Sequence, residues 1–483
     1  MIDRLLSRKA GVVRTFPSSL LLRLLSSSLS LSARHRPALL CPSTVTMQVA
    51  HSQTVADDAS QALYQSAIFH LNSLQSNVEL LQKLREKRHM HQETNISDTI
   101  ARLKKCGIEP IALDRLNVIH VSGTKGKGST CAFVESILRR VGFRTGLYTS
   151  PHLVYVRERI RINGKPISED LFSKYFFTVY NKLKKHEGED GMPGYFKFLT
   201  LLAFHVFLEE NVDVAIVEVG IGGEYDNTNI IQHPIVCGVT TLDIDHTSLL
   251  GSSLLEIAWN KAGIMKSGAP VIVSPSSEDV LSVMRSRALE RGTELKVAPC
   301  YQSYSYAKGN ISPGIAGDHQ KCNMSLALQL SRAWLKQMGF EASTFPDVKE
   351  NNWEVGEAFS VPATIVEAIE SCHWRGRSQI VITDRKHMFD YSLFCPTVLS
   401  TLPDKKSDIA NFNQSAADQQ ARSDQCATTW KKIGTGEVLV FDCITSAIQW
   451  VERLSDMENL DVLVTGSLHL VGGVLSLIEP SVE

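Results

Sequence analysis

The sequence predicts an α/β protein with a large doubly wound parallel sheet of the P-loop type and a second, smaller α/β domain. Three observations indicate this fold. Apolar runs of about five to seven residues alternate with helical segments, as in a parallel sheet covered on both faces. A glycine-rich string lies between one of these runs and the helix that follows. The 483 residues also exceed a single core, at roughly 100 to 200 residues per domain.

The first 46 residues differ in composition from the rest of the chain. They hold six Arg, one Lys and nine Ser but a single acidic residue, Asp3. A basic, Ser-rich, acid-poor leader is typical of an organelle transit peptide, and we expect a mitochondrial address, with a plastid as the alternative. A second start at Met47 would give a cytosolic form. The other interpretation is a disordered tail without an address.

The first folded domain is expected over residues 47–370, where strands and helices follow one another. Residues 60–87 have helical periodicity with charged breaks, which suits a helix that covers a sheet edge. A loop is expected over residues 314–320. Strands are predicted at 117–122, 144–148, 213–219, 236–242 and 269–273, and helices at 129–141, 199–210, 254–266 and 321–338.

The second domain is expected over residues 371–483. Residues 404–427 have almost no apolar periodicity, and we predict a flexible insertion there. Short β-rich runs on either side of it predict strands at 379–383, 391–394, 438–441 and 461–465.

The composition argues against several classes of protein. Fifty Lys and Arg against 51 Asp and Glu leave a net charge of -1, without the one-signed excess typical of proteins that bind nucleic acid or a membrane surface. No uncharged apolar stretch reaches the roughly 18 residues that a membrane span needs. The ten Cys include no CxxC pair and no zinc-type cluster, so we expect free thiols in a reducing compartment.

The string GTKGKGS at 123–129 is the most specific local signal. It lies between a predicted strand and a predicted helix, the context in which glycines let backbone amides converge on phosphate oxygens. Lys127 adds a mobile cation, and the hydroxyl of Ser129 is suited to the magnesium that accompanies a nucleotide. Val121 and Gly128 depart from the strict P-loop pattern. The alternative is a glycine-rich turn that binds nothing.

Two polar side chains at predicted strand ends indicate a metal site. Glu218 follows the run DVAIV, and Asp245 and His246 are expected to close the next strand. The carboxyl ends of parallel strands meet at one edge of a sheet, next to the glycine-rich string. A carboxylate and an imidazole there would supply ligands for Mg²⁺. A histidine taken alone is more often a capping or packing residue.

Three arginines alternate with other residues in a short segment. If this segment is extended, Arg157, Arg159 and Arg161 lie on one face. A row of guanidinium groups suits a polycarboxylate or a phosphate, because each group can hold two oxygens. The alternative is a solvated hairpin edge.

These strings together resemble the folylpolyglutamate synthases of the Mur ligase superfamily, in their plant-type eukaryotic form. They cover most of the chain after the leader, and their order and spacing are highly specific. They are GTKGKGS (123–129), TSPHLVYVRERIRINGKPIS (149–168), VEVGIGGEYDNTN (217–229), LDIDHTSLLG (242–251), IAWNKAGIMKSG (257–268), WRGRSQIV (374–381) and VLVTGSLHLVGG (462–473).

The resemblance implies a tetrahydrofolate:L-glutamate γ-ligase that forms ADP. Such an enzyme adds L-glutamate to the γ-carboxylate of tetrahydrofolate or a folylpolyglutamate through an acyl phosphate. An N-terminal ATPase domain and a smaller, Rossmann-like C-terminal domain are implied, with ATP and Mg²⁺ as cofactors and K⁺ as an optional further ion. The expected partners are these small molecules and no nucleic acid, and the chain is expected to act as a monomer.

The resemblance also assigns roles by position. Lys127, Lys261 and His246 are the catalytic candidates, and Lys261 matches a lysine that is carbamylated in the family. One magnesium would be held by Ser129 and Glu218 and a second by Ser150, Glu218 and His246. The ATP-binding residues would be Gly123, Thr124, Gly126, Lys127, Gly128, Ser129, Asn323 and Arg377, and the folate-binding residues Ser150, Pro151, His152, Arg157, Arg159 and Arg161.

The C-terminal part departs from the family pattern. After WRGRSQIV, family members continue to a DGAH-type motif whose Asp contacts the nucleotide, but this chain runs into MFDYSLFCP (388–396) and has no DGAH string. Two or three strand-and-helix units, on the order of 60 to 100 residues, are expected to be absent, so the C-terminal domain is truncated. One alternative function is therefore a catalytically impaired isoform that binds nucleotide or folate. Dihydrofolate synthase activity, in the same superfamily, is another.

Overall fold

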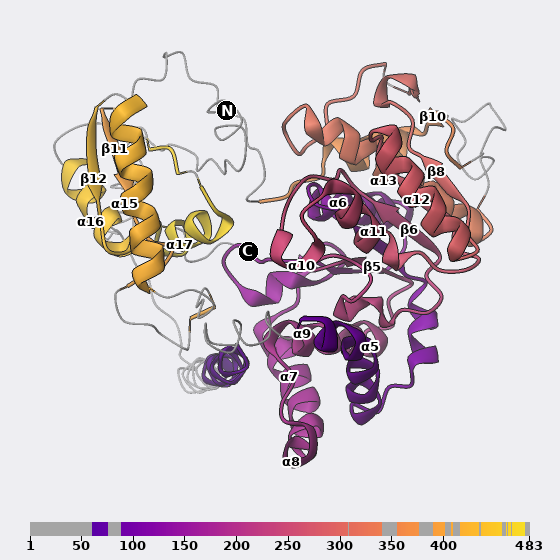
Figure 1. Cartoon of the computed structure of the whole chain (residues 1–483), viewed down its shortest axis with the longest axis horizontal. Coiled ribbons are helices and arrows are strands. Elements are labelled where there is room, and N and C mark those ends of the chain that lie inside the picture. The colour runs from indigo at the N-terminus through magenta and orange to yellow at the C-terminus, as the bar shows by residue number, and fades with distance from the viewer. Residues whose placement is uncertain are drawn as a thin grey trace, which may run out of the picture. The chain divides into compact units, whose positions relative to one another are not determined.

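The computed structural model of the chain contains two compact units (Figure 1). The larger unit holds Leu74–Ser168 and Lys174–Ile380, and the smaller holds Met1–Ser73, Glu169–Ser173 and Val381–Val482. The residues that the structure describes are 60–75, 88–307, 309–340, 355–375, 390–400, 407–408, 416–433, 436–455, 460, 462–464 and 466–478.

A sheet with helices on both faces makes up the larger unit. Its strands are β1 (Ile119–Ser122), β2 (Thr145–Tyr148), β3 (Ile160–Ile162), β4 (Lys165–Pro166), β5 (Val214–Glu218), β6 (Val236–Val239), β7 (Val271–Val273) and β8 (Leu295–Val297). The principal helices are α5 (Arg88–Lys105), α6 (Lys127–Val141), α7 (Glu169–Lys184), α9 (Tyr195–Glu209), α10 (Thr247–Leu250), α11 (Leu254–Lys261), α12 (Glu278–Glu290), α13 (His319–Gln337) and α14 (Ala363–Glu370). The short 3₁₀ turns η1 (Pro110–Leu116), η2 (Val156–Arg159), η3 (Asn227–Ile230) and η4 (Ala262–Ile264) complete the connections that matter for the site.

The sheet is mostly parallel, as the sequence predicts. The strand order is β4–β3–β2–β5–β1–β6–β7–β8, and the pairs from β2 through β8 are all parallel. The two pairs at one edge, β2 with β3 and β3 with β4, are antiparallel. Every residue of β1 and β5 is buried, because these central strands have neighbours on both edges and helices on both faces. The carboxyl ends of β1 and β5 therefore lie side by side.

Alternate residues of each strand face different helices. Ile119, Leu147 and Ile216 belong to the apolar cluster that includes α6 and α13. Gly146 faces the other side, where a Cβ would lie 2.8 Å from Cδ1 of Phe207 in α9. Figure 1 shows α6 and α13 on one side of the sheet and α5 and α9 on the other. Successive side chains of a strand point to opposite faces of the sheet, so each face packs against its own layer of helices.

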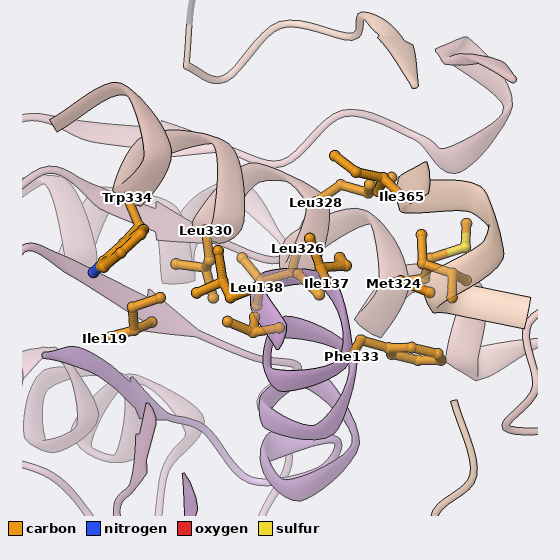
Figure 2. Packing of buried hydrophobic residues seen from close by; sticks show 14 of the residues in the cluster. Ile119, Phe133, Ile137, Leu138, Met324, Leu326, Leu328, Leu330, Trp334 and Ile365 are labelled. Carbon is orange, nitrogen blue, oxygen red and sulfur yellow. The ribbon is translucent and has the colours of Figure 1, made fainter. Parts of the chain in front are cut away.

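The packing of α6 against α13 holds the helix that follows the glycine-rich string. Figure 2 shows Phe133, Ile137 and Leu138 of α6 meeting the apolar face of α13 above the sheet. Trp334 of α13 is fully buried, and its indole nitrogen donates a hydrogen bond to the carbonyl oxygen of Asn117 at 2.7 Å. These contacts fix the first turn of α6 relative to β1.

The smaller unit is built around a two-stranded parallel sheet. Strand β11 (Tyr391–Phe394) pairs with β12 (Glu437–Val440), and no residue of either strand is buried. Its described helices are residues 60–73, α15 (Ala416–Ile433), α16 (Ile444–Ser455) and α17 (Leu468–Ile478). Among the described residues, no helix is long and apolar enough to cross a membrane.

The prediction of a flexible insertion over residues 404–427 is wrong for its second half, which belongs to helix α15. Gln419, Ser423 and Ala427 are buried at a spacing of four residues, and Gln419 accepts a hydrogen bond from the Thr397 hydroxyl at 2.8 Å. Helical periodicity is present, but polar and small residues carry it. A search for apolar periodicity could not find it.

One further prediction is wrong, and several others fall on residues that the structure does not describe. Residues 462–464 form no strand, and Leu463 is 43% exposed, so the strand predicted at 461–465 is wrong where the structure describes it. A strand needs a paired neighbour, and none pairs with residues 462–464 in the part of the chain that the structure describes. The leader 1–46, Met47, residues 76–87, the predicted strand 379–383 and Arg377 lie outside the described residues.

Candidate active site

The glycine-rich string forms a tight turn between β1 and α6. The backbone amides of Thr124 and Lys125 donate to the carbonyl oxygen of Thr241, at 3.0 and 3.1 Å. Gly123 and Gly126 have φ of +140° and +87°, and a Cβ on Gly126 would lie 2.1 Å from Oδ1 of Asn323. Glycine is therefore required at both positions. The turn leads directly into the positive N-terminal end of α6, which suits an anion.

Two lysines converge on this turn. Nζ of Lys127 and Nζ of Lys261 both donate to the carbonyl oxygen of Gly123, at 2.9 and 2.8 Å. Lys261 is only 2% exposed, and burial, with the positive charge of Lys127, lowers its pKa to about 7. Lys125 forms an ion pair with Asp245 at 2.9 Å. Two lysine amino groups thus meet at one carbonyl beside the N-terminal end of α6, an arrangement that suits an anionic ligand.

Oxygen ligands lie at the neighbouring strand ends. Glu218, the last residue of β5, is 3% exposed and its Oε2 accepts a hydrogen bond from the backbone amide of Ser150 at 2.9 Å. Ser129 is buried in the first turn of α6. The charge of Glu218 adds to burial in raising the pKa of Cys131, two residues further along α6. Glu218 pairs in register with Val121 of β1, so it lies beside the strand end that leads into the glycine-rich turn.

His246 reaches the same region by a different route from the one predicted. Strand β6 ends at Val239, and His246 follows a loop and precedes α10, with φ of +50°. The expectation that it closes the strand in register with Glu218 is wrong, because the chain leaves the sheet before it. Partial desolvation lowers the pKa of His246; Asp245 opposes this, and Lys261 and Lys127 add to it. This shift favours the neutral imidazole, the form that binds metals.

The donor set at this edge fits Mg²⁺. It offers one carboxylate, one imidazole and the hydroxyls of Ser129 and Ser150, few protein ligands for an ion that usually keeps waters and binds phosphate oxygens. The described residues contain no cluster of three or more His, Cys, Asp or Glu that would hold a metal on its own. An ion here would therefore depend on oxygens from a nucleotide.

The three arginines do not form one extended row. Arg157 and Arg159 lie in the 3₁₀ turn η2, and only Arg161 is in strand β3. Each guanidinium has its own aromatic partner: Tyr155, Tyr195 and Trp374 respectively, at 5.0, 5.5 and 4.8 Å from the ring centroid. A 3₁₀ turn repeats every three residues, so it separates side chains that a strand would align.

The segment that carries these arginines also places His152. Nε of Arg159 donates to Nδ1 of His152 at 2.9 Å, and both side chains are buried. Pro151 beside it is exposed. Arg159 thus holds the His152 ring in place through this hydrogen bond.

Sequence reasoning missed Glu158, which organises this segment. Its carboxylate accepts hydrogen bonds from the backbone amides of Leu153, Val154 and Tyr155, at 3.0, 2.8 and 2.7 Å. An acidic residue in the first turn of a helix, here the turn η2, was the available signal.

Comparison with known proteins identifies the family. The mitochondrial folylpolyglutamate synthase of Bos taurus is 34% identical over 545 aligned positions, which span 87% of this chain and 93% of the bovine protein. A Caenorhabditis elegans protein that carries the folylpolyglutamate synthase name is 42% identical over 503 positions, spanning 91% of this chain and 97% of its own length. The chain belongs to the folylpolyglutamate synthase family. No protein-family model matches it.

Solved structures of folylpolyglutamate synthases share the fold. A complex with AMPPCP has a TM-score of 0.58 at 21% identity and covers 86% of this chain and 99% of its own. Escherichia coli FolC in complex with DHPP and ADP has a TM-score of 0.55 at 25% identity and covers 84% of this chain and 99% of its own. The two-domain Mur ligase fold expected from the sequence is thus confirmed.

The C. elegans alignment also contains positions that this chain lacks. Its 503 positions span 91% of 483 residues, about 440, so about 60 positions of that relative have no counterpart here.

Proposed function

We propose that the chain is an ATP-dependent ligase that adds L-glutamate to the γ-carboxylate of tetrahydrofolate or a folylpolyglutamate through an acyl phosphate. Family membership over nearly the full length of the relatives supports this activity. The observation that carries it at the level of the site is the convergence of Lys127 and Lys261 on the carbonyl of Gly123, at the N-terminal end of α6. Related structures hold AMPPCP with folate, or ADP with DHPP.

The phosphates of ATP are assigned to the turn between β1 and α6. The amides of the turn and the ammonium of Lys127 would neutralise the β- and γ-phosphates, and Lys261 would lie beside them. Asn323, near the N-terminal end of α13, is 3% exposed and lies against Gly126, and it would contact the nucleotide. The full proposed ATP set is Gly123, Thr124, Gly126, Lys127, Gly128, Ser129, Asn323 and Arg377.

Magnesium and folate are assigned to neighbouring groups. Ser129 and Glu218 would hold one Mg²⁺, and Ser150, Glu218 and His246 a second; K⁺ is a further proposed ion. When bound, Mg²⁺ supplies positive charge to phosphate oxygens. Folate is assigned to Ser150, Pro151, His152, Arg157, Arg159 and Arg161, with Arg159 acting through His152. The ATP-binding domain is proposed over residues 47–370, and the C-terminal glutamate-ligase domain over 371–483.

The chemistry explains why this site needs cations. A carboxylate does not react with an amine at neutral pH, because its carbonyl carbon is electron-rich and its leaving group is poor. Transfer of the γ-phosphoryl group to the folate carboxylate gives an acyl phosphate and ADP. The glutamate amine then attacks, an amide forms and phosphate leaves. Both reactants of the first step are anions, so Lys127, at the N-terminal end of α6, is placed to reduce their repulsion.

A purified sample tests the proposal directly. The expected result is lengthening of tetrahydrofolate by mass spectrometry that requires both ATP and L-glutamate. Competition between tetrahydrofolate and dihydropteroate as acceptors separates this activity from dihydrofolate synthesis. Nucleotide binding without any product would reject ligase activity and identify a catalytically impaired isoform.

We propose a mitochondrial location and a monomer. Mammalian relatives are named mitochondrial folylpolyglutamate synthases, which supports the address predicted for residues 1–46. Fusion of this leader to a fluorescent protein should direct it to mitochondria, and a fusion that starts at Met47 should stay in the cytosol. Plastid import of the longer fusion would contradict the address. Light scattering after gel filtration should give the mass of one chain, 53.5 kDa before removal of the leader.

A further inference from the structure

The segment after β5 packs directly on the turn that carries Lys261. A Cβ on Gly222 would lie 2.4 Å from Oδ1 of Asn260, and one on Gly223 would lie 2.7 Å from the carbonyl oxygen of Lys261. From the other side, a Cβ on Gly263 would lie 2.4 Å from Cα of Glu224. The two backbones therefore touch, and small displacements of one segment must move the other.

Hydrogen bonds join the same two segments. The amide of Glu224 donates to the carbonyl oxygen of Asn260 at 2.8 Å. The side-chain amide of Asn229 donates to the carbonyl oxygens of both Glu224 and Gly263, at 3.0 and 3.1 Å. Glu224 thus lies at the centre of the contact.

Two arginines near the end of α12 bind the carboxylate of Glu224. Arg291 donates to its two oxygens at 2.6 and 2.8 Å, and Arg287, whose side chain is 4% exposed, donates to Oε2. Arg287 also lies 4.3 Å from the ring centroid of Trp259, two residues before Lys261 in α11. One buried guanidinium therefore contacts both the segment after β5 and the helix that ends at Lys261.

Lys261 is fixed from the opposite side by the turn after β1. Its carbonyl oxygen accepts a hydrogen bond from the Ser122 hydroxyl at 2.9 Å, and its ammonium reaches Gly123. We propose that Glu224, held by Arg287 and Arg291, is a positioning residue that sets the place of the Lys261 side chain beside the turn between β1 and α6. This proposal rests on the proposed function, in which Lys261 belongs to the ATP site.

Kinetics of matched variants test the proposal. Glu224→Gln keeps the shape of the side chain but removes its charge. We expect kcat to fall about tenfold, while KM for ATP and for folate stays within about twofold. The reason is that the variant changes only the placement of a charged group in the transition state. Glu290→Gln is the control: Glu290 bonds the same Arg287 at 2.6 Å, but its side chain is 58% exposed and contacts neither segment through a described bond. It should leave kcat unchanged.

A second readout does not depend on activity. Acetylation of lysines in the apo protein, followed by peptide mass spectrometry in bicarbonate-free buffer, should be several-fold faster at Lys261 in Glu224→Gln than in Glu290→Gln, since local loosening exposes it. Lys197, paired with Asp98 and 14% exposed at its side chain, is the internal reference. Equal labelling of Lys261 in the two variants, or a parallel rise at Lys197, would overturn the proposal.

The two readouts separate this proposal from the proposed function. If the unmodified chain makes no product, ligase activity fails, but the labelling of Lys261 still decides the positioning role. If Glu224→Gln does not fold, Arg291→Met replaces it, because that side chain is 30% exposed and supplies hydrogen bonds to both carboxylate oxygens of Glu224. Selective labelling of Lys261 in Arg291→Met supports the proposal, and unchanged labelling overturns it.

Discussion

Lys127 is the residue on which the anion site most directly depends. Replacing it with Ala removes one of two ammonium groups beside Gly123 without touching the buried core. We expect kcat to fall at least about 100-fold, the size seen when one preorganised donor is removed from a transition state. ADP release measured with saturating folate and glutamate checks this.

Lys125→Ala is the matched control, because Lys125 is 42% exposed at its side chain and pairs with Asp245. It should cost much less activity than Lys127→Ala. Near-normal turnover of Lys127→Ala would mean that the turn is only structural.

The single buried residue His120 makes the free energy of unfolding depend on pH. It is fully buried in β1, and burial, followed by the charge of Lys266, lowers its pKa from 6.5 to about 3. The unfolded chain therefore binds a proton between pH 6.5 and 3 that the folded chain does not. Stability from this group is complete above pH 6.5 and falls by about 1.4 kcal/mol per pH unit below it.

His120→Gln should remove this dependence. A glutamine keeps an N–H near the position of Nε2, which lies 2.8 Å from the hydroxyl of Thr228. Between pH 6.5 and 5 the unmodified protein should lose about 2 kcal/mol more than the variant. Urea unfolding at both pH values measures the difference, and identical losses would contradict the assignment.

At the scale of elements, stability depends on α13 closing one face of the sheet. Leu330 of α13 is fully buried, and a Cβ on Gly238 of β6 would lie 2.7 Å from its Cδ1. Leu330→Ala should lower the free energy of unfolding by about 2–5 kcal/mol, from lost burial and the cavity left behind. Leu289→Ala, at a position 83% exposed, should change it by less than about 0.5 kcal/mol. Similar urea midpoints for the two variants would contradict this packing.

At the scale of the whole molecule, the two units should differ in stability. Parallel strands are normally buried on both faces, and a two-stranded sheet alone is marginal in water. Strands β11 and β12 have no buried residue, and Val440 and Leu477 are 39% and 40% exposed. We expect two calorimetric transitions, with the smaller unit unfolding first.

An ATP analogue provides the control for this prediction. It should raise the temperature of the higher transition, because the phosphate-binding turn belongs to the larger unit. A single cooperative transition that includes both units would show that the smaller unit is not independently weak.

The predictable part of the fold follows local patterns. The strands β1, β2, β5, β6 and β7 lie within the runs predicted for them, because short segments rich in apolar and β-branched residues favour a buried parallel strand. The buried face of α15 was not predictable from apolar periodicity, because Gln419 and Ser423 carry it. Likewise, the arginine row failed because φ and ψ at Arg157 and Arg159 are set by the turn around Glu158.

By itself, the sequence determined the α/β class, the glycine-rich turn and the family, since these depend on glycine geometry, β-propensity and motif order along the chain. The tertiary structure decided which groups meet. Lys261 reaches Gly123, and Glu224 reaches Arg287 and Arg291, across separations of many residues. Such contacts depend on how strands are ordered and helices are packed, and short-range sequence patterns contain no information about that arrangement.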